Sequence, residues 1–599
     1  MKKCCLIIIM AFSIVLSIFA RNYNEFDVIV IGTDPEGISA AISSARNGMN
    51  TLLIDTRQKV GGLFTMGGLN SLDMNYSSDG TLLTQGIFEE FFINIHPENA
   101  TAGFWDKRDS FDIAHAEQIL LSMINNEPNI TLILGIDNIA PVCENNKIIN
   151  LDALDNGVVH KFYGKTFIDA TQDADIAALA RAPYNIGGMD INNPSQIQAI
   201  TQVFKINNVD WEALRANIYS NINYYNADMN AYSAWGFLDI MRKYEPIHNN
   251  IKVRGLNIGL QDDGSVLINA MQIIGLDPLN DYELKLAQEI SLIECENITN
   301  YIKEHIPGFQ SATYGGITEE LYVRESRHII GEYILSASDM MSHTNFYDKI
   351  AWGGYPIDIQ TTNIDNWGYV IGDPQAYSIP FRCIIPLRID NLLVASRSAS
   401  YHSIGFGSVR VVPIGMVVAQ AAGVACSYAV NNNISFREMA YNINIMEQIQ
   451  QALINQGAFL ENLDIEYSYE NHSFKEGINY AYDNGLIIGS YNNELKLDDL
   501  ALASKAIQMF DTVRRIEEIE VVQNNMYLQN EHISFIQLTF ILFEMLLELP
   551  DTNPDKRIIL FEQGVISEAL FDRFNNGILV TNADLYQTFY ELSKYLNSK

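Results

Sequence analysis

Short apolar runs alternate with one helix-length segment in the first part of the chain. Residues 26–31 (Phe-Asp-Val-Ile-Val-Ile) are almost continuously apolar and β-branched, which is typical of a strand buried on both faces. Residues 35–48 have proline near the start and glycine at the end, which predicts a helix. Residues 51–54 predict a second buried strand. A strand, a helix and a strand within about thirty residues form a right-handed parallel unit.

Some later segments predict further strands of the same sheet, whereas two other regions of the chain have a different pattern. Residues 130–136 and 165–168 predict further strands, and residues 391–395 predict another, followed by an apolar helix from about Val409 to Val430. The stretch between them mixes strand and helix signals, and short helices with Asn-rich turns follow residue 440. The chain is therefore predicted to have an α/β fold with a Rossmann-like dinucleotide-binding domain in two parts (26–184 and 381–440), an inserted α+β substrate domain (185–380) and a mostly helical C-terminal domain (441–599).

The N-terminus has the pattern of a secretory signal peptide. Two lysines precede an uncharged apolar run from Leu6 to Phe19, and Ala20 offers a small residue for cleavage. The run is shorter than the roughly 20 residues that a membrane-spanning helix needs. We expect residues 1–20 to direct export, so that the protein is secreted or associated with the cell surface. An uncleaved membrane anchor is the alternative.

Charge limits the partners of the chain. Its 72 acidic residues outnumber its 38 basic residues and give a net charge of −34. Such an excess repels phosphate backbones and excludes nucleic acid as the main partner. The cysteines beyond the predicted signal peptide are far apart in sequence, so neither a disulfide framework nor a metal site is predicted at Cys143, Cys295, Cys383 and Cys426.

A glycine motif stands at the junction between the first predicted strand and the first predicted helix. In Gly32-Thr-Asp-Pro-Glu-Gly37, the first glycine permits a tight turn and the last permits close packing of the helix on the sheet. The helix start presents free N–H groups and a partial positive charge to a pyrophosphate. Asp55 ends the second strand, where a carboxylate can accept hydrogen bonds from a ribose. Asp34 replaces the usual middle glycine, and its side chain would lie near a phosphate.

Later segments favour FAD over NAD as the dinucleotide. The glycine pairs at 61–62 and 67–68 let the backbone approach a long cofactor. Residues 167–171, followed by acidic residues, and a return segment over 391–423 are not needed by an NAD domain. The candidate cofactor contacts are Gly32, Asp34, Pro35, Glu36, Gly37, Asp55, Thr56, Arg57, Gly61, Gly62, Leu63, Asp169, Ala170, Thr171, Asp173, Arg397, Gly407, Ser408 and Val409.

These motifs resemble the FAD-dependent oxidoreductases of the two-dinucleotide-fold type, in their bacterial branch. The resemblance covers about residues 26–435 and implies a Rossmann-like FAD-binding domain with FAD as cofactor. It also implies that the inserted domain covers the flavin and binds a small-molecule substrate, and that Gly407 and Ser408 open a helix whose N-terminus faces the flavin. Gln172 stands where the family usually has glycine. The segments that carry the resemblance are 30–41, 168–175, 324–327, 352–357, 379–382 and 407–413.

Basic residues mark where the chemistry is expected. Arginine can clamp a carboxylate or a sugar oxygen through two parallel hydrogen bonds. His402 is the best acid/base candidate, because its unperturbed pKa is near neutrality and its loop precedes the expected flavin-facing helix. The catalytic candidates are therefore His402, Arg382, Arg324 and Arg327. An internal ion pair is the alternative for Arg324 and Arg327, and a structural histidine is the alternative for His402.

The C-terminal region weakly resembles S-layer homology repeats. Residues 481–487 recur in altered form at 561–566, and Thr581-Asn-Ala-Asp584 keeps part of the usual Thr-Arg-Ala-Glu element. The resemblance implies attachment to cell-wall polysaccharide. A generic helical domain that packs on the catalytic part is the alternative.

The sequence as a whole predicts an exported FAD-dependent oxidoreductase that transfers a hydride between a small organic or carbohydrate-like substrate and flavin. The electron acceptor is not specified by the sequence. The main alternative is a non-catalytic cell-surface binding protein whose degenerate dinucleotide fold no longer holds FAD, which Asp34 and Gln172 favour. A polysaccharide lyase or hydrolase is a third hypothesis, although the sequence has no Gly-x-Ser-x-Gly elbow.

Overall fold

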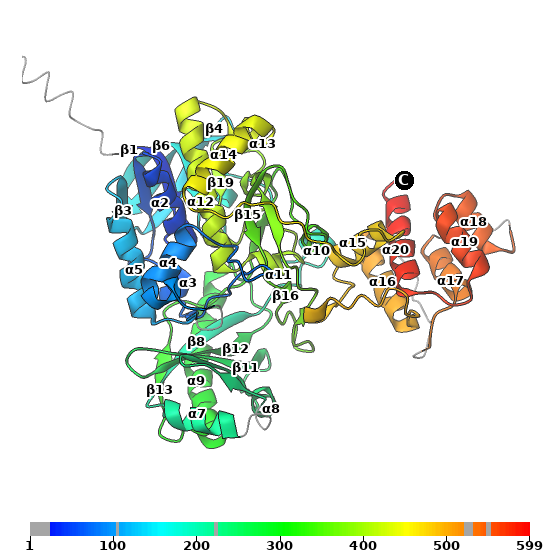
Figure 1. The fold of residues 1–599 in the computed structure, drawn as a ribbon, viewed down its shortest axis with the longest axis horizontal. Helices are drawn as coiled ribbons and strands as arrows, with labels where there is room; N and C mark the ends of the chain where they lie inside the picture. The colour runs from blue at the N-terminus through cyan, green and yellow to red at the C-terminus, as the bar shows by residue number, and fades with distance from the viewer. Residues whose placement is uncertain (1–23, 104–106, 221–225, 520–530, 547–552, 599) are drawn as a thin grey trace, which may run out of the picture.

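A computed structural model describes residues 24–103, 107–220, 226–519, 531–546 and 553–598. The predicted signal peptide at 1–20 lies outside these residues. Figure 1 shows a body built on a sheet, an inserted domain beside it, and a C-terminal helical lobe that projects to one side.

A largely parallel sheet forms the centre of the body. Its strand order is β3-β2-β1-β6-β5-β4, and β19 pairs with β6. Strands β1, β2, β3, β6 and β19 run parallel, as predicted, whereas β4 and β5 form an antiparallel meander that leads into β6. Val28, opposite Thr51 on one side and Thr166 on the other, is fully buried. The strands are β1 (Glu25–Ile31), β2 (Thr51–Ile54), β3 (Ile130–Ile133), β4 (Asn138–Glu144), β5 (Lys147–Asp155), β6 (Val158–Asp169) and β19 (Leu392–Val394).

Two helices from distant parts of the chain pack against each other on this sheet. Small residues bring α2 (Pro35–Arg46) and α12 (Val412–Asn432) close together: a Cβ on Gly423 would lie 2.6 Å from the Ala40 carbonyl oxygen. Ser39 also donates to the Met416 carbonyl at 2.6 Å. α12 is the one described helix that is long and apolar enough to cross a membrane, but 89% of that stretch is buried inside the protein. It is therefore a core helix.

The inserted domain has its own sheet and its own core. The strand order is β13-β8-β12-β11-β10-β9, all antiparallel. A separate hydrophobic core runs from Phe204 to Ala312, which is narrower than the predicted 185–380. The elements are β8 (Ile200–Asn207), α7 (Trp211–Ser220), β9 (Asp228–Met229), β10 (Ser233–Gly236), α8 (Leu238–Met241), β11 (Ile251–Leu260), β12 (Val266–Ile273), α9 (Asp281–His305) and β13 (Thr313–Ile317).

The segment after the insert rejoins the body. Trp352 and Tyr377 lie in the main core, because β15 and β18 pair there and α12 packs on β15. The remaining body elements are α3 (Gly62–Thr65), α4 (Ile87–Ile95), η1 (Pro97–Ala100), α5 (Ile113–Asn125), α6 (Asp175–Leu179), β7 (Tyr184–Ile186), η3 (Met189–Ile191), β14 (Arg327–Ile329), α10 (Ala337–Met341), β15 (Lys349–Gly353), β16 (Asp358–Ile359), β17 (Tyr369–Val370), β18 (Tyr377–Pro380), η4 (Phe381–Ile384), α11 (Phe406–Val409), α13 (Phe436–Ala440) and α14 (Ile443–Asn455).

The C-terminal lobe begins after α14, because α14 still packs on α12 of the body. Three helices of the lobe, α16, α17 and α20, are each preceded by a short extended segment. The bridges Leu500–Thr581, Leu502–His532 and Ser534–Leu579 join these segments in a ring. Ser338 of α10 donates twice to Asp483, through its N–H and its hydroxyl, and so ties the lobe to the body. The lobe contains α15 (Lys475–Asp483), η5 (Ser490–Asn492), α16 (Ala503–Ile516), α17 (Phe535–Met545), α18 (Lys556–Glu562), α19 (Glu568–Asn576) and α20 (Asn582–Leu596).

Candidate functional site

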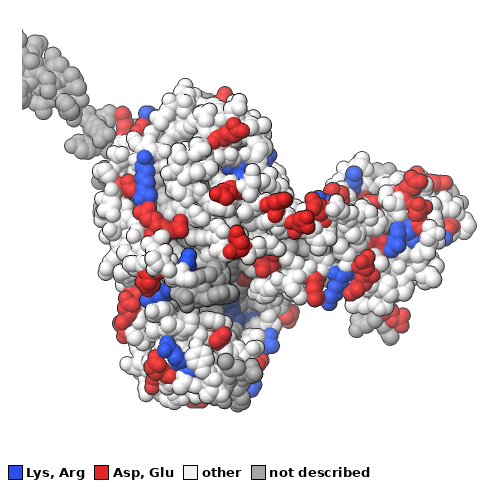
Figure 2. Space-filling model, viewed as in Figure 1, with Lys and Arg blue, Asp and Glu red and all other residues white. Residues whose placement is uncertain are grey.

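Two cavities lie where the body meets the inserted domain. The first, the dinucleotide cleft, has a volume of about 290 Å³ and is lined by residues that include Asp34, Arg57, Gln172, Asp173, Glu320 and Arg397. The second, the arginine cavity, has a volume of about 230 Å³ and is lined by residues that include Asp73, Arg254, Arg324, Tyr355, Asp358 and Arg410. One segment belongs to both, since Leu321 and Val323 line the cleft whereas Tyr322 and Arg324 line the cavity. Figure 2 shows acidic and basic side chains interspersed on one face of the body and the inserted domain.

The glycine motif forms a tight crossing at the floor of the cleft. Gly32 has a φ of +101°, and a Cβ there would lie 2.7 Å from the Ala170 carbonyl oxygen. A Cβ on Gly37 would lie 2.0 Å from the Gly32 carbonyl oxygen, so only glycine lets α2 start this close to β1. Pro35 stands in the first turn of α2, where its missing N–H costs no helical hydrogen bond. The loop therefore has the backbone of a dinucleotide site.

Asp55, at the end of β2, lies at the ribose position but already has partners within the chain. Its carboxylate accepts from the backbone N–H and the hydroxyl of Thr33, both at 2.6 Å, and from the Arg57 N–H at 3.0 Å. Thr56 follows it on the same loop, with its hydroxyl 3.5 Å from Asp55. These contacts hold the carboxylate at the rim of the cleft.

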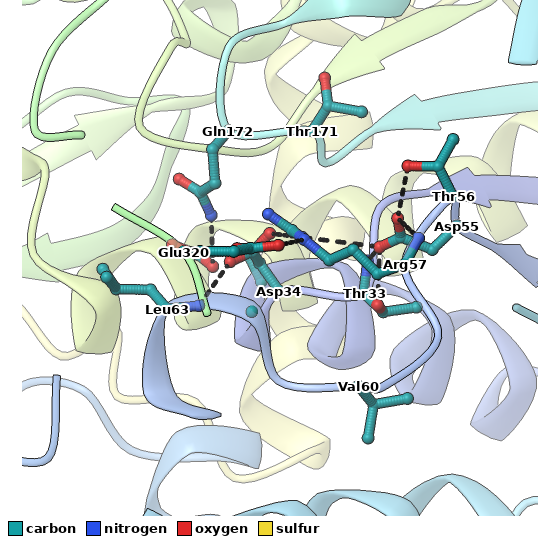
Figure 3. Close-up of polar contacts among 12 residues, drawn as sticks. Thr33, Asp34, Asp55, Thr56, Arg57, Val60, Leu63, Thr171, Gln172 and Glu320 are labelled. Atoms are coloured by element: carbon teal, nitrogen blue, oxygen red, sulfur yellow. Dashed lines mark hydrogen bonds and ion pairs between the residues drawn. The ribbon is translucent and has the colours of Figure 1, made fainter. Parts of the chain in front are cut away.

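Asp34 occupies the place where its position in the motif would bring a phosphate. Its fully buried carboxylate accepts from the Leu63 N–H at 3.0 Å and pairs with Arg57 (Figure 3). Arg57 also donates to Glu320 at 2.8 Å, across the cleft. Gly62 has a φ of +38°, and a Cβ there would overlap Asp34, so only glycine lets the backbone lie this close to the carboxylate. The chain thus supplies its own anion to donors that a pyrophosphate would use.

Glu36 adds a second buried carboxyl beside Asp34. Burial, and then the charge of Asp34, raise the pKa of Glu36 to about 8. The amide of Gln172 donates to Glu36 at 3.0 Å, and Gly415 leaves the space that the Glu36 side chain fills. Glu36 is therefore neutral near pH 7 and does not add to the negative charge of the cleft there.

The end of β6 and the loop after it hold the other predicted cofactor residues, of which Asp173 lines the cleft. Asp169 accepts from the hydroxyl of Thr171 at 2.6 Å, and burial raises its pKa to about 7. Ala170 lies directly against Gly32, where its carbonyl leaves no room for a side chain. Arg397 reaches over from the return segment and donates to Asp173 at 2.6 Å and to Gln172 at 3.0 Å. Among the described residues, the buried Nε of Arg397 has no hydrogen-bond partner.

The predicted flavin-facing helix differs from the expectation. Gly407, Ser408 and Val409 lie inside the short helix α11, whose N-cap is Gly405, and the long helix α12 starts only at Val412. The two are separate because Val411 has extended backbone and Pro413 begins the next helix. Ser408 is buried and contacts the hydroxyl of Tyr377 at 2.6 Å.

The cleft fits FAD on these observations. The left-handed Gly32 and the close crossing at Gly37 suit a pyrophosphate at the N-terminus of α2. Asp55 suits the ribose, and the partnerless Nε of Arg397 is a donor available inside the cleft. A pyrophosphate at this loop would lie near the Asp34 carboxylate and its two partners, the Leu63 N–H and Arg57.

The arginine cavity holds the strongest group of polar side chains outside the cleft. Arg324 stacks on the Tyr322 ring, with its Cζ 4.2 Å from the ring centroid, and Arg410 donates to the Tyr322 hydroxyl at 3.1 Å. Burial, together with the charges of Arg254 and Arg410, lowers the pKa of Arg324 to about 10. Tyr355 donates to Asp73 at 3.2 Å, and burial raises the pKa of Asp73 above its usual value.

Of the four predicted catalytic residues, the structure places only Arg324 in this cavity. Arg382 is held by Asp348 through two hydrogen bonds of 2.8 and 3.0 Å, in an ion pair that was not predicted. Arg327 donates to Asp175 at 2.8 Å and to the Asp173 carbonyl at 2.6 Å, behind the cleft. His402 lies 3.5 Å from Asp190 and lines neither cavity.

Sequence reasoning missed Asp73, Arg254 and Arg410 as site residues. Arg410 belongs to the motif segment 407–413, and its position directly after Gly407–Val409 was a usable signal. Arg254 gave no such signal, because it reaches the cavity through a register shift of β11 against β12 between Val253 and Asn257. Bulges of this kind re-aim side chains beside active sites.

Comparison with known proteins identifies the family. The model of the family described as FAD dependent oxidoreductase matches residues 27–453. Among solved structures, the chain is similar to a geranylgeranyl bacteriochlorophyll reductase-like protein (Ta0516) from Thermoplasma acidophilum, at 12% identity over 79% of this chain and 94% of that chain, with a TM-score of 0.36. It is also similar to p-nitrophenol 4-monooxygenase PnpA from Pseudomonas putida DLL-E4, at 9% identity over 72% and 88% of the two chains, with a TM-score of 0.34. A third similar structure is the myxobacterial chondrochloren halogenase CndH, at 13% identity over 80% of this chain and 92% of that chain, with a TM-score of 0.35.

These structural likenesses are too distant to say anything about the reaction of this chain. The family match is a different matter, because it spans more than half of the 599 residues and includes the glycine motif, the β6 segment and the return segment. The predictions of an FAD enzyme and of the α/β fold are confirmed. This chain belongs to the FAD dependent oxidoreductase family, and it is an FAD-dependent oxidoreductase with FAD as its cofactor.

Proposed function

We propose that this chain oxidises or reduces a small organic molecule held in the arginine cavity, with a hydride passing between that molecule and FAD. The observation that carries the proposal is the position of the cavity against α11. Arg410 lines the cavity and follows directly on Gly407–Val409, and the carbonyl of Tyr355, another lining residue, accepts a hydrogen bond from Ser408. When bound, FAD supplies a ring that can accept or donate a hydride, which is one proton with two electrons.

Asp73 is the residue that would hold or release the substrate proton. It lines the cavity, is hydrogen-bonded by Tyr355, and has a pKa that burial raises towards the working range of a general acid or base. His402 was the expected acid/base residue, but its contact with Asp190 lies outside the cavity. We therefore assign the proton to Asp73.

Anaerobic reduction of the FAD-loaded protein tests this function. A panel of small alcohols, acids and amines is added to the full chain, and loss of the visible absorbance of the flavin is followed. We expect at least one class to bleach the wild type and not Asp73→Asn, while Asp365→Asn, in an exposed loop, behaves as the wild type. Bleaching at equal rates in all three proteins would remove Asp73 from the reaction. A chain that takes up no FAD would overturn the function.

We also propose that the protein is exported and that its C-terminal lobe attaches it to cell-wall polysaccharide. The support is the ring of three bridged segments, each at the start of a helix, since this is the arrangement that three related repeats would give. Thr581 caps the last of these helices, with Asp584 completing the capping box. The full chain should sediment with purified cell walls and not with walls stripped of polysaccharide. Sequencing of the mature N-terminus should start after residue 20.

A further inference from the structure

Three guanidinium groups meet in the arginine cavity, although the chain as a whole is strongly acidic. Arg254 comes from β11 of the inserted domain, Arg324 from the segment shared with the cleft, and Arg410 from the end of α11. Arg324 is 2% exposed and Arg410 is 9% exposed. Bringing like charges together in a buried site is unfavourable unless something negative joins them.

The chain itself neutralises these arginines only in part. Arg410 lies 3.5 Å from the Asp358 carboxylate, a long ion pair. Arg324 donates to the Ala199 carbonyl at 2.9 Å and to the Thr201 hydroxyl at 2.7 Å, and Arg254 donates to Gln360 at 3.3 Å, all of them uncharged acceptors. Among the described residues, neither Arg254 nor Arg324 forms an ion pair.

Polar atoms without partners face the same space. The Nε atoms of Arg254 and Arg410 are buried and have no hydrogen-bond partner among the described residues. The same holds for the Oγ of Ser233 and the Oδ1 of Asn269, which also line the cavity. Asn269 lies in a second irregular stretch, where β12 shifts register against β8 between Ile268 and Met271. Two strand irregularities thus turn donors and acceptors into one cavity.

The charge balance selects the kind of anion. Three arginines face Asp73 and Asp358, which leaves one excess positive charge when both carboxyls are ionised, the state in which Asp73 can accept the substrate proton. A single carboxylate matches this excess, whereas a phosphate monoester carries close to two negative charges near pH 7. The planar fork of arginine also suits a planar carboxylate.

The remaining walls describe the rest of the ligand. Leu69, Ile258 and Trp235 supply apolar surface, and the volume of about 230 Å³ is below the usual size of a drug-binding pocket. We infer that the substrate is a small organic acid with a single carboxylate, held by Arg254, Arg324 and Arg410. This inference rests on the proposed function in taking the cavity ligand to be the substrate.

Calorimetric titration of the full chain tests the inference without turnover. The probes are lactate and benzoate, their neutral amides lactamide and benzamide, and inorganic phosphate. We expect the two acids to bind at least tenfold more tightly than their amides and than phosphate. Arg254→Gln should weaken binding of the acids at least tenfold, whereas Arg215→Gln, an equal charge loss on α7 away from the cavity, should change it less than twofold.

Arg254→Lys guards against a folding defect, because it keeps the charge and loses only the planar pair of donors. Its affinity for the acids should lie between those of the wild type and Arg254→Gln. Equal binding of acids and amides, tighter binding of phosphate, or indifference to both Arg254 variants would overturn the inference. Failure of the proposed function looks different: the acids bind as expected, but no bound acid bleaches the flavin anaerobically. If a neutral compound bleaches the flavin of Arg254→Gln at the same rate as that of the wild type, the proposed function is supported and the inference of an organic-acid substrate is overturned.

Discussion

The two cavities of this protein share a wall and have opposite electrostatic character. The dinucleotide cleft is lined by Asp34, Asp173, Glu319 and Glu320 against two arginines, whereas the arginine cavity has three arginines against two carboxyls. In the cleft, Arg57 and Arg397 are both paired with carboxylates of the chain. In the cavity, Arg254 and Arg324 have only neutral partners among the described residues. What matters for anion binding is therefore how far an arginine is already neutralised, and not its presence alone.

This comparison gives Asp34 a defined role. We expect the FAD pyrophosphate to compete with the Asp34 carboxylate for Arg57 and the Leu63 N–H, which would lower the affinity of the cleft. The arginine cavity carries no such internal competitor for Arg254 and Arg324, whose hydrogen-bond acceptors among the described residues are uncharged. Four changes test or sharpen this contrast.

Asp73→Asn should have the largest effect, on turnover. General acid–base catalysis contributes about 10²–10⁴-fold, so we expect kcat to fall at least about 100-fold. Affinity for FAD should stay within twofold of the wild type, since Asp73 lies in the other cavity. Anaerobic stopped-flow measurement gives the rate of flavin reduction. A decrease of less than tenfold in this rate would mean that another group moves the proton.

Asp34→Gly should strengthen FAD binding by about 10- to 100-fold, because it removes a charge close to the incoming phosphates and frees Arg57 and the Leu63 N–H. Asp34→Asn, which keeps the size and removes the charge, should lie in between. Binding of lactate or benzoate should not change. Equilibrium dialysis with FAD measures the effect, and unchanged or weaker affinity in Asp34→Gly would contradict the role of Asp34 as a competitor.

Glu36 should make the cleft sensitive to pH. Its folded pKa of about 8 lies above the ordinary value of 4.5, so the protonated form is favoured in the folded protein. FAD affinity should fall by up to about tenfold per pH unit as Glu36 ionises above about pH 8. The same sign applies to folding: Glu36 reduces the free energy of unfolding as pH rises from about 4.5 to 8.

Glu36→Gln should remove this pH dependence from FAD affinity above about pH 8 and from the free energy of unfolding between about pH 4.5 and 8. The other groups should titrate as before. Binding of the organic acids should not follow this titration, because Glu36 does not line the arginine cavity. FAD affinities of the wild type and Glu36→Gln between pH 6 and 9.5 give the comparison. Parallel profiles would place the titration on another residue.

Arg382→Gln should have the smallest effect on either ligand. It leaves the fully buried Asp348 without its partner, which should lower the free energy of unfolding by about 2–3 kcal/mol given the partial exposure of Arg382. Both FAD and organic-acid affinities should stay within twofold of the wild type. Urea unfolding measures the free energy of unfolding, and calorimetry measures the two ligand affinities. A tenfold loss of ligand affinity would return Arg382 to the site.

The sequence predicted the parallel sheet well, because buried parallel strands are continuous apolar runs that stand out from their surroundings. It also located Gly32, Asp34 and Asp55, since a short strand–turn–helix unit places them together. The sequence did not predict the arginine cavity, because Asp73, Arg254 and Arg410 are far apart in the chain and meet only when the inserted domain packs on the body. The roles of the other predicted site residues depend on which side chains they contact in the folded protein. Nothing in the sequence around Arg382 shows that Asp348, 34 residues earlier, is the carboxylate that binds it.

FAD is expected to bind in the acidic cleft at the Gly32 loop in spite of Asp34. Titration of FAD into the purified wild-type chain at pH 7, with Asp34→Gly measured in parallel, decides whether it does. We expect one FAD per chain with quenched flavin fluorescence in both proteins, and tighter binding in the variant. Absence of binding in both proteins would contradict it.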